Sequence, residues 1–313
     1  MFNIAIMGCG NIANRIARGI VYSEGCLYAA CSRDKEKAKA FALKYPTCKY
    51  MTYEEVLEDP NVDLIYIATI NTTHYDLIKR CLNAKKNVIC EKPMLATTDE
   101  IREVFDLAKE QGCFLMEAHK TCFTSLNTYL KTRIDEIGEI RRIEAQYCGK
   151  IDVSLMKESN NREVTMGGSF FDIGVYPICF ANLYAQSPIR EINIVSTQAD
   201  GYPVDVETIA ELVYENGITA RVKSSWRDSS VNKGVIQGEK GCVEIVYFWK
   251  NTEAVFIKDG KREEIHVEQD SDFTGEINEA IHCIKEGKLQ SSVMSEEASV
   301  EICRVLEELK KQY

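Results

Sequence analysis

Apolar and polar positions follow two different patterns along the chain, one before and one after about residue 140. Over the first 118 residues, short apolar runs alternate with longer amphipathic stretches, which is typical of buried strands separated by helices. The predicted strands are Phe2–Met7, Leu27–Ser32, Val62–Thr69, Asn87–Cys90 and Cys113–Met116. The predicted helices are Ile12–Tyr22, Asp34–Tyr45, Tyr53–Glu58, Thr73–Ala84 and Asp99–Gln111. This alternation predicts an α/β domain with a doubly wound parallel sheet.

Beyond this point, successive strands joined by short turns replace the alternation. The turn signals include Glu215-Asn216-Gly217, Glu239-Lys240-Gly241 and Lys258-Asp259-Gly260. The predicted strands are Glu139–Gly149, Glu191–Ala199, Glu207–Tyr214, Ile218–Trp226, Gly234–Gln237, Cys242–Trp249, Ala254–Lys258 and Glu263–Val267. Helices are expected at Phe170–Tyr184, Phe273–Glu286 and Ser295–Gln312. The pattern predicts a second α/β domain with a large, mostly antiparallel open sheet.

The chain is long enough for two domains, since 313 residues exceed what one hydrophobic core usually supports. We expect residues 1–119 to form the first domain and residues 120–313 the second. Whether the last helix, about residues 295–312, packs back on the first domain is left open. Thr97-Thr98-Asp99-Glu100 predicts a capping box at the start of one helix of the first domain, and Gly112 predicts its end.

Charge and cysteine usage narrow the class of protein. A formal net charge of -10 argues against nucleic-acid and anionic-membrane partners. The N-terminal segment lacks the basic flank of a signal peptide, and no apolar run approaches the roughly 20 residues that span a bilayer. The thirteen cysteines are odd in number and include no CxxC pair, and only four histidines are present. We therefore expect a protein of the reducing cytoplasm without a metal site.

The strongest local motif follows the first predicted strand and opens the first helix. It reads Gly8-Cys9-Gly10-Asn11-Ile12-Ala13, a GxGxxA variant of the Rossmann dinucleotide fingerprint. Gly8 permits the tight turn, Gly10 lets the backbone approach a pyrophosphate, and Ala13 allows close contact between helix and strand. Amides at the helix N-terminus then face the phosphate oxygens.

The end of the second strand selects between the two nicotinamide dinucleotides. Sites that prefer NAD usually carry Asp or Glu there, whereas this chain has Cys31, Ser32 and Arg33. The Arg33 guanidinium can pair with a 2′-phosphate, so we expect NADP, with NAD left open. The alternative is that Arg33 is only the solvated start of the next helix, with Asp34 as its cap.

Two further loops follow strands of the first sheet, at the edge where parallel sheets bind ligands. One contains Ala68, Thr69, Asn71 and His74, and the other contains Glu91 and Lys92, within Val88–Pro93. We expect these six residues to contribute to the cofactor site. His74 is equally consistent with an orienting hydrogen bond to the backbone.

Together these motifs resemble those of the Gfo/Idh/MocA oxidoreductase family, in the family's order. The resemblance rests on the glycine loop, on Ala68–His74, on Glu91-Lys92-Pro93 and on Met116-Glu117-Ala118. It continues at Gly167–Tyr176, which resembles the family's GGxxxDxGxY segment. Within the family, Ser32-Arg33 and Tyr176 are most similar to the dimeric dihydrodiol dehydrogenase branch.

The resemblance implies a catalytic site made of Lys92, Tyr176 and Asp172. Lys92 would donate a hydrogen bond to the reacting oxygen and stabilise its charge. Tyr176 would exchange the proton with that oxygen, helped by a neighbouring ammonium that favours the phenolate. Asp172, four residues earlier, would orient Lys92 or bind a substrate hydroxyl. Each has a plainer alternative: a surface lysine paired with Glu91, a packing aromatic, and a structural carboxylate near a helix start.

We therefore expect an NADP-dependent dehydrogenase or reductase that acts on a hydroxyl or carbonyl of a small polyol, sugar or cyclic diol. The alternatives are a non-catalytic nucleotide-bound sensor of the same fold, and a lyase or transferase that returns its nicotinamide unchanged. The resemblance also implies a homodimer or homotetramer. Pocket residues are expected among Asn71–His74, His119–Phe123 and the Asn160–Gly168 loop, where Asn160, Asn161 and Arg162 suit hydroxyl or anion recognition.

Overall fold

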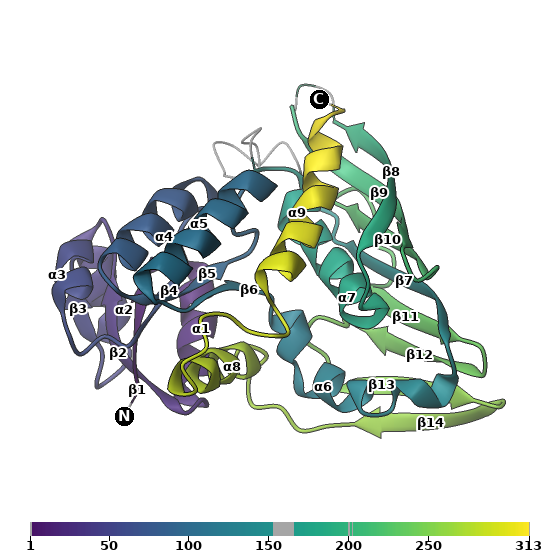
Figure 1. Cartoon of the computed structure of the whole chain (residues 1–313), viewed down its shortest axis with the longest axis horizontal. Coiled ribbons are helices and arrows are strands. Elements are labelled where there is room, and N and C mark those ends of the chain that lie inside the picture. The colour runs from purple at the N-terminus through teal and green to yellow at the C-terminus, as the bar shows by residue number, and fades with distance from the viewer. Residues whose placement is uncertain (1, 153–165, 200, 202, 313) are drawn as a thin grey trace. The chain divides into compact units, whose positions relative to one another are not determined.

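Six parallel strands form the first sheet, in the order β3-β2-β1-β4-β5-β6 (Figure 1). The computed structural model describes residues 2–152, 166–199, 201 and 203–312. The strands are β1 (Phe2–Met7), β2 (Gly25–Cys31), β3 (Lys49–Met51), β4 (Leu64–Ile67), β5 (Asn87–Glu91) and β6 (Leu115–Ala118). The intervening helices are α1 (Asn11–Val21), α2 (Lys35–Ala42), α3 (Tyr53–Glu58), α4 (His74–Asn83) and α5 (Thr98–Gln111). The predicted doubly wound parallel sheet is confirmed.

The apolar pattern gave no signal for β3. This strand lies at the edge of the sheet, where Lys49 and Tyr50 are exposed, so no buried run marks it. The capping box at α5 is confirmed: Thr97 accepts from the Glu100 amide, Glu100 reaches back to Thr97, and Gly112 ends the helix at φ 66°. The strand order reverses between β1 and β4: β2 and β3 lie on one side of this pair, and β5 and β6 lie on the other. In a doubly wound sheet, a ligand crevice forms at this point.

The second sheet has eight strands, in the order β14-β13-β12-β11-β7-β10-β9-β8. They are β7 (Ile140–Cys148), β8 (Ile189–Gln198), β9 (Asp205–Tyr214), β10 (Thr219–Ser225), β11 (Lys233–Gly238), β12 (Gly241–Val246), β13 (Glu253–Lys258) and β14 (Lys261–His266). Every pairing is antiparallel except β7 with β10. Strand β7 lies near the centre of this sheet, between the meander β8–β10 and the meander β11–β14. The prediction of a mostly antiparallel sheet is confirmed.

Two local predictions in this half of the chain differ from the structure. The strand expected at Cys242–Trp249 stops at Val246, because Tyr247 adopts φ 51° and its amide donates to the Asn232 carbonyl. Helix α6 (Ser125–Lys131), capped by Thr124, was not expected. Helices α7 (Val175–Ala185), α8 (Thr274–Lys285) and α9 (Glu296–Lys310) lie at the predicted positions.

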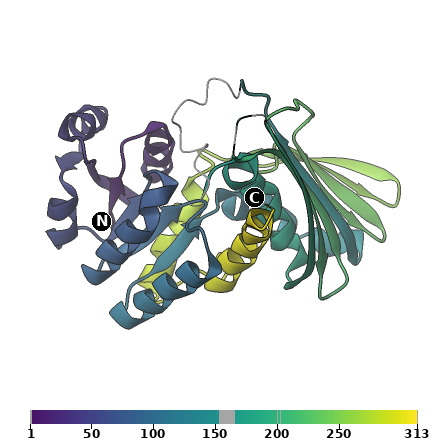
Figure 2. The ribbon, with the colours of Figure 1, turned by 90° about the horizontal axis from the view of Figure 1, so that it is seen from above.

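Burial along the second sheet distinguishes its two faces. In β9, residues Val206 to Tyr214 alternate between buried and half-buried positions. Helix α7, which contacts β7, β10 and β11, covers the buried face, and Figure 2 shows the strands in a single curved layer. On the other face, the strand register places one residue of each strand from β13 to β8 in a row across the sheet. These residues are Val255, Glu244, Val235, Glu144, Arg221, Glu211 and Asn193.

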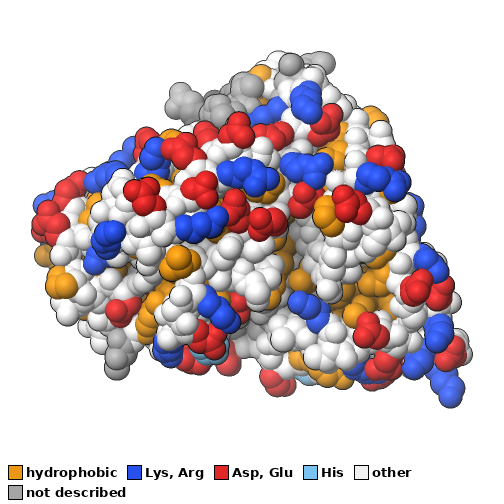
Figure 3. Space-filling view, viewed as in Figure 1, with side chains coloured by type: hydrophobic (Ala, Val, Ile, Leu, Met, Phe, Trp, Pro, Cys, Tyr) orange, Lys and Arg blue, Asp and Glu red, His pale blue; other side chains and the backbone are white. Residues whose placement is uncertain are grey.

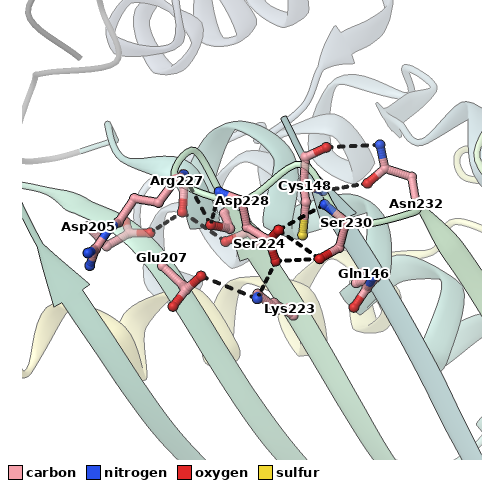
Figure 4. A network of polar contacts seen from close by, with 12 residues as sticks. Gln146, Cys148, Asp205, Glu207, Lys223, Ser224, Arg227, Asp228, Ser230 and Asn232 are labelled. Carbon is pink, nitrogen blue, oxygen red and sulfur yellow. Dashed lines mark hydrogen bonds and ion pairs between the residues drawn. The ribbon is translucent and has the colours of Figure 1, made fainter. Parts of the chain in front are cut away.

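A polar network fixes the loop that follows β10 (Figure 4). Lys223 on this strand pairs with Asp228 at 2.9 Å and with Glu207 on β9 at 3.2 Å. The Asn232 side chain accepts from the Cys148 amide and donates to the Cys148 carbonyl. It therefore makes the two hydrogen bonds to β7 that the backbone of a neighbouring strand would otherwise make. The loop between β10 and β11 is therefore tied to β10 through Asp228 and to β7 through Asn232.

The described chain divides into two compact units. The first comprises Met1–Lys120 with Asp270–Ser299, and the second comprises Thr121–Gln269 with Val300–Tyr313. Helix α8 thus belongs to the first unit although it follows the whole second sheet in sequence, and α9 begins in the first unit and continues in the second. The predicted boundary between the two domains, at residues 119 and 120, stays a prediction.

The surface and the helices add two observations. On the face drawn in Figure 3, cationic and anionic side chains are interspersed. Among the helices of the described residues, none is both long and apolar enough to cross a membrane.

Two glycines of the first loop provide a matched test of this packing. Gly8 has φ 110°, and a Cβ there would lie 2.6 Å from the Ala68 carbonyl oxygen, whereas a Cβ at Gly10 would meet nothing within 4 Å. We expect Gly8→Ala to lower the free energy of unfolding by at least about 2 kcal/mol. Gly10→Ala should cost less than about 1 kcal/mol. Urea unfolding of both variants measures the difference, and equal losses would contradict the close approach of the two backbones.

Candidate functional site

An open cleft of about 1060 Å³ lies in the first unit, at the carboxyl ends of β1, β2 and β4. These strands flank the reversal of strand order, so the cleft is where the topology predicts a ligand. Its lining residues are Gly8, Cys9, Gly10, Asn11, Asn14, Ser32, Arg33, Lys35, Lys37, Lys44, Thr52, Tyr53, Glu54, Ala68, Thr69, Ile70, Thr73, Asp76, Leu77 and Arg80.

The glycine loop forms the floor of the cleft. The Gly8 amide donates to the Cys31 carbonyl at 2.8 Å, and its positive φ turns the chain from β1 into α1. Gly10 stands at the N-cap of α1, where it has no side chain to cover the amides of the first turn. Ala13 is fully buried. Uncapped amides at a helix N-terminus, reached through open backbone, fit a pyrophosphate.

Cationic side chains border the cleft beside β2. Arg33, Lys35, Lys37 and Lys44 all line it, and the Lys44 ammonium also donates to Oδ1 of Asn14 at 3.0 Å. The chain leaves β2 through buried Cys31 into Ser32 and Arg33, so the position that carries a carboxylate in NAD-preferring sites holds none. This edge of the cleft fits an additional phosphate.

Sequence reasoning missed three of these cations. Lys35 and Lys37 alternate with acids and resemble a solvated helix face, and Lys44 lies beyond the end of α2, with no motif around it. Asp34 does cap α2, accepting from the amides of Glu36 and Lys37. Arg33 precedes this cap and lines the cleft. The segment therefore both starts a helix capped by Asp34 and places Arg33 at the candidate cofactor site, so each alternative describes part of the segment.

Only some of the predicted cofactor residues line this cleft. Those that do are Gly8, Cys9, Gly10, Asn11, Ser32, Arg33, Ala68 and Thr69. Those that lie elsewhere in the first unit are Ile12, Ala13, Asn71, His74, Glu91 and Lys92, and their contact with a cofactor stays a prediction. Among the second group, Ala13 and His74 are fully buried.

His74 connects two loops at the edge of the sheet. Its Nδ1 lies 3.2 Å from the Pro93 carbonyl and 3.1 Å from the Met94 carbonyl, and its Nε2 lies 3.3 Å from the Thr69 carbonyl. Burial lowers the pKa of this imidazole, although the carbonyls oppose the shift. The contacts are those of the orienting role: the ring joins the loop after β4 to the loop after β5.

The loop after β5 carries Lys92, which is half-buried. Glu91 is buried, and its carboxylate accepts from the Tyr66 hydroxyl at 3.1 Å and from the Lys92 amide at 3.3 Å. Further along, Glu117 on β6 accepts from the Met94 amide at 2.8 Å and lies 3.2 Å from Nε2 of His119. Buried acids therefore hold the backbone on both sides of Lys92.

The second unit contains Asp172 and Tyr176 on one continuous helical segment. A π-helical turn (Phe170–Gly174) leads into α7. From residue 169 to residue 185, Asp172, Tyr176 and Asn182 are half-buried and all other residues are buried. The two predicted catalytic side chains are thus the ones that this segment leaves partly open near its start.

Buried Asp205 explains the glycine before this segment. Its Oδ2 accepts from the Ser169 hydroxyl at 2.5 Å, from the Phe170 amide at 3.0 Å and from the Thr208 hydroxyl at 2.9 Å. A Cβ at Gly168, where φ is 96°, would collide with the other carboxylate oxygen of Asp205. Gly168, the second glycine of the motif, therefore leaves room for a carboxylate to bind the N-terminus of the helix.

Aromatic rings surround Tyr176. Its ring centroid lies 5.6 Å from that of Tyr147 on β7 and 6.0 Å from that of Trp249, and those two rings stack at 3.8 Å. Neither Tyr147 nor Trp249 lies in a recognisable motif, so sequence reasoning had no signal for them. Asn160, Asn161 and Arg162, expected in the pocket, lie outside the described residues.

Comparison with known proteins gives the same assignment for both units. Residues 2–119 match the model for the oxidoreductase family with an NAD-binding Rossmann fold, and residues 129–244 match the GFO/IDH/MocA C-terminal domain. The chain is 30% identical to trans-1,2-dihydrobenzene-1,2-diol dehydrogenase of Mus musculus, an alignment that covers 98% of this chain and 95% of that protein. It is also 30% identical to the NADP-dependent scyllo-inositol 2-dehydrogenase IolU of Bacillus subtilis, over 100% and 97% of the two chains.

Among solved structures, the aldose-aldose oxidoreductase of Caulobacter crescentus has the same fold. The TM-score is 0.87 at 24% identity, with 99% of this chain and 96% of that chain covered. The N-terminal model spans the sheet that carries the cleft, and the C-terminal model spans the segment of Asp172 and Tyr176. With a glycine loop, two matched domains and relatives that align over nearly their whole length, the chain is an oxidoreductase of the Gfo/Idh/MocA family.

Proposed function

We propose that this oxidoreductase uses NADP to transfer a hydride between nicotinamide and a hydroxyl or carbonyl carbon of a small polyol, sugar or cyclic diol. The observation that carries the cofactor assignment is the cleft, in which an uncapped helix N-terminus lies beside Arg33 and three lysines. The substrate class is supported by relatives named for a dihydrodiol and for scyllo-inositol.

The residues fit the parts of a dinucleotide one by one. The first-turn amides of α1 would bind the pyrophosphate, and Ser32 and Arg33 would bind the 2′-phosphate. Ala68 and Thr69, which follow β4, would contact the part of the dinucleotide that continues past the end of this strand. When bound, the nicotinamide supplies the hydride donor or acceptor. The protein supplies orientation and the proton.

NADP preference can be tested by titrating the cofactor-free protein with NADPH and with NADH, following nicotinamide fluorescence. We expect NADPH to bind more tightly, and Arg33→Ala to weaken NADPH by about tenfold to a hundredfold, the range for a charge-assisted hydrogen bond. The same variant should leave NADH affinity nearly unchanged. Lys39→Ala is the matched control, since Lys39 is an exposed cation of α2 outside the cleft lining. Equal affinity of wild type and Arg33→Ala for NADPH would refute the assignment.

Lys92 and Tyr176 are proposed as the groups that act on the substrate oxygen. Lys92 would stabilise the developing alkoxide or polarise the carbonyl, and Tyr176 would transfer the proton. Asp172 would orient Lys92 or bind a substrate hydroxyl. The stacked rings beside Tyr176 provide an apolar wall of the kind that binds the carbon face of a sugar or cyclic diol.

The proposed roles predict a separation between turnover and cofactor binding. Lys92→Ala and Tyr176→Phe should each lower kcat by about a hundredfold or more, while NADPH affinity changes little. Lys131→Ala and Tyr50→Phe, at exposed positions, are the matched controls. Steady-state kinetics with a panel of polyols, sugars and cyclic diols makes the measurement. Full activity of both variants would remove these residues from the mechanism, and a wild-type protein that binds NADPH without turnover would favour the sensor.

A second copy of this chain is the proposed partner. On the sheet face opposite α7, half-buried Ile209 and Val213 and the 73% exposed Val195 lie between ion pairs such as Arg221–Glu211 at 2.5 Å. Such a mixed face suits an isologous interface between identical sheets.

Light scattering tests the oligomeric state. We expect a mass of two or four times the chain mass of 35.5 kDa. We expect Ile209→Glu, which places a charge among the apolar side chains of this face, to shift the mass toward that of a single chain. Val21→Glu, an exposed apolar position on α1, is the control. A single-chain mass for the wild type at micromolar concentration would contradict the proposal.

The proposed location is the cytoplasm. All thirteen cysteines are thiols in the described chain, and nine of them are buried. A reducing compartment keeps such thiols in this state.

A further inference from the structure

A buried chain of polar side chains lies behind the loop that carries Lys92, within the first unit. The phenol oxygen of Tyr66 on β4 lies 3.1 Å from Oε1 of Glu91 and 2.7 Å from Oε1 of Glu276 on α8. Tyr66 and Glu276 have no exposed surface, and Glu91 is 9% exposed. Two carboxyl groups therefore meet a single phenol where solvent does not reach.

The two contacts of the Tyr66 oxygen require more than one proton. A phenol has one hydrogen, so Tyr66 can donate to only one of the two carboxyl oxygens. The other contact is a hydrogen bond only if that carboxyl carries a proton and donates it to the phenol oxygen. Two ionised carboxylates would leave one buried oxygen facing a lone pair, which is costly in a medium of low dielectric constant.

The surroundings decide which carboxyl holds the proton. Burial raises the pKa of Glu91 as well, but its carboxylate accepts from the Lys92 amide, and the positive charges of Lys92 and Lys120 oppose this rise. The groups that face Glu276 are Tyr66, Glu91, Lys120 and Asp272. Lys120 contacts Asp272 directly, and Arg15 also pairs with Asp272, so the charge of Lys120 is shared.

Glu276 has the weaker support for a negative charge. Burial and the charge of Glu91 raise the pKa of Glu276 well above its ordinary value. Among the residues that the structure describes, Oε2 of Glu276 has no hydrogen-bond partner. A neutral acid tolerates this position better than a carboxylate does.

We propose that Glu276 is a protonated carboxylic acid at neutral pH, and that it donates to Tyr66, which in turn donates to Glu91. These two hydrogen bonds leave a single negative charge, on Glu91, one residue before Lys92. Glu276 and Tyr66 are thus positioning residues: they orient the Glu91 carboxylate and keep it ionised. The consequence for catalysis rests on the proposed role of Lys92, whereas the protonation of Glu276 does not.

Infrared spectroscopy of the full-length protein tests the proton directly. A protonated carboxylic acid has a carbonyl stretch separate from the carboxylate bands, and we expect one such band near neutral pH that disappears in Glu276→Gln. Glu103→Gln is the control, because Glu103 is exposed and ion-paired with Lys79 at 2.7 Å. A band that survives in Glu276→Gln and disappears in Glu91→Gln would place the proton on Glu91 and overturn the proposal, as would the absence of any such band.

If Glu276→Gln does not fold, Tyr66→Phe provides the same information. Without the phenol, Glu276 loses its acceptor, so the band should move in frequency rather than vanish. An unchanged band in Tyr66→Phe would show that the protonated group does not donate to this tyrosine, and the proposal would fail.

Stability gives a second readout that does not depend on activity. Glu276 keeps its proton when folded and loses it when unfolded above its ordinary pKa of 4.5. The folded state is therefore favoured less as pH rises from this value toward the raised pKa. The unfolding constant of wild type relative to Glu276→Gln should rise by about tenfold per pH unit in that window. A pH-independent ratio would overturn the proposal.

The link to Lys92 has its own test. Because the Tyr66 hydroxyl stabilises ionised Glu91, we expect Tyr66→Phe to move the acidic limb of the kcat profile to higher pH by about 0.5–1 unit, the effect of one hydrogen bond. A merely structural role would lower kcat without moving this limb. Should Lys92→Ala retain turnover while the infrared band behaves as expected, the proposed function fails and the protonation of Glu276 stands.

Discussion

The approach of the backbone at Gly8 to the carbonyl of Ala68 is the constraint on which the first unit depends. It brings the end of β1 against the end of β4, the two strands between which the sheet order reverses. Because Gly8 has no side chain, α1 can start close to the sheet, with its first residues lining the cleft. A bulkier residue would separate the strands and remove both the turn and the floor of the site.

Charge is distributed unevenly around this frame. The whole chain is acidic, with a formal net charge of -10, yet four cations border one edge of the cleft. A local positive region in a negative protein attracts a small polyanion while the remaining surface repels large ones. The buried carboxyls around Tyr66 lie on other elements, α8 and the end of β5. The cationic edge of the cleft and the surroundings of Lys92 are therefore separate electrostatic environments within one unit.

The sequence contained most of the fold and part of the site. Helices and strands with clear periodicity, such as β1, α3 and the capped α5, were predictable because local packing and capping decide them. The parallel pairing of β7 with β10 was not, since strand periodicity is the same for both directions. The glycine loop and Arg33 were found from their motif. Lys44, Tyr147 and Glu276 were not, because only the folded chain brings them beside their partners.

The first unit is assembled from two distant stretches of the chain, and this has a consequence for its synthesis. The Thr274 hydroxyl donates to the Gly19 carbonyl, and the Asn278 side chain accepts from the Glu24 amide, so α8 completes the packing around α1 and the start of β2. A ribosome must therefore translate the entire second sheet before the partner of the N-terminal helix emerges. Until then the apolar surface that α8 covers in the folded unit stays exposed on the nascent chain, and exposed surface of this kind favours aggregation.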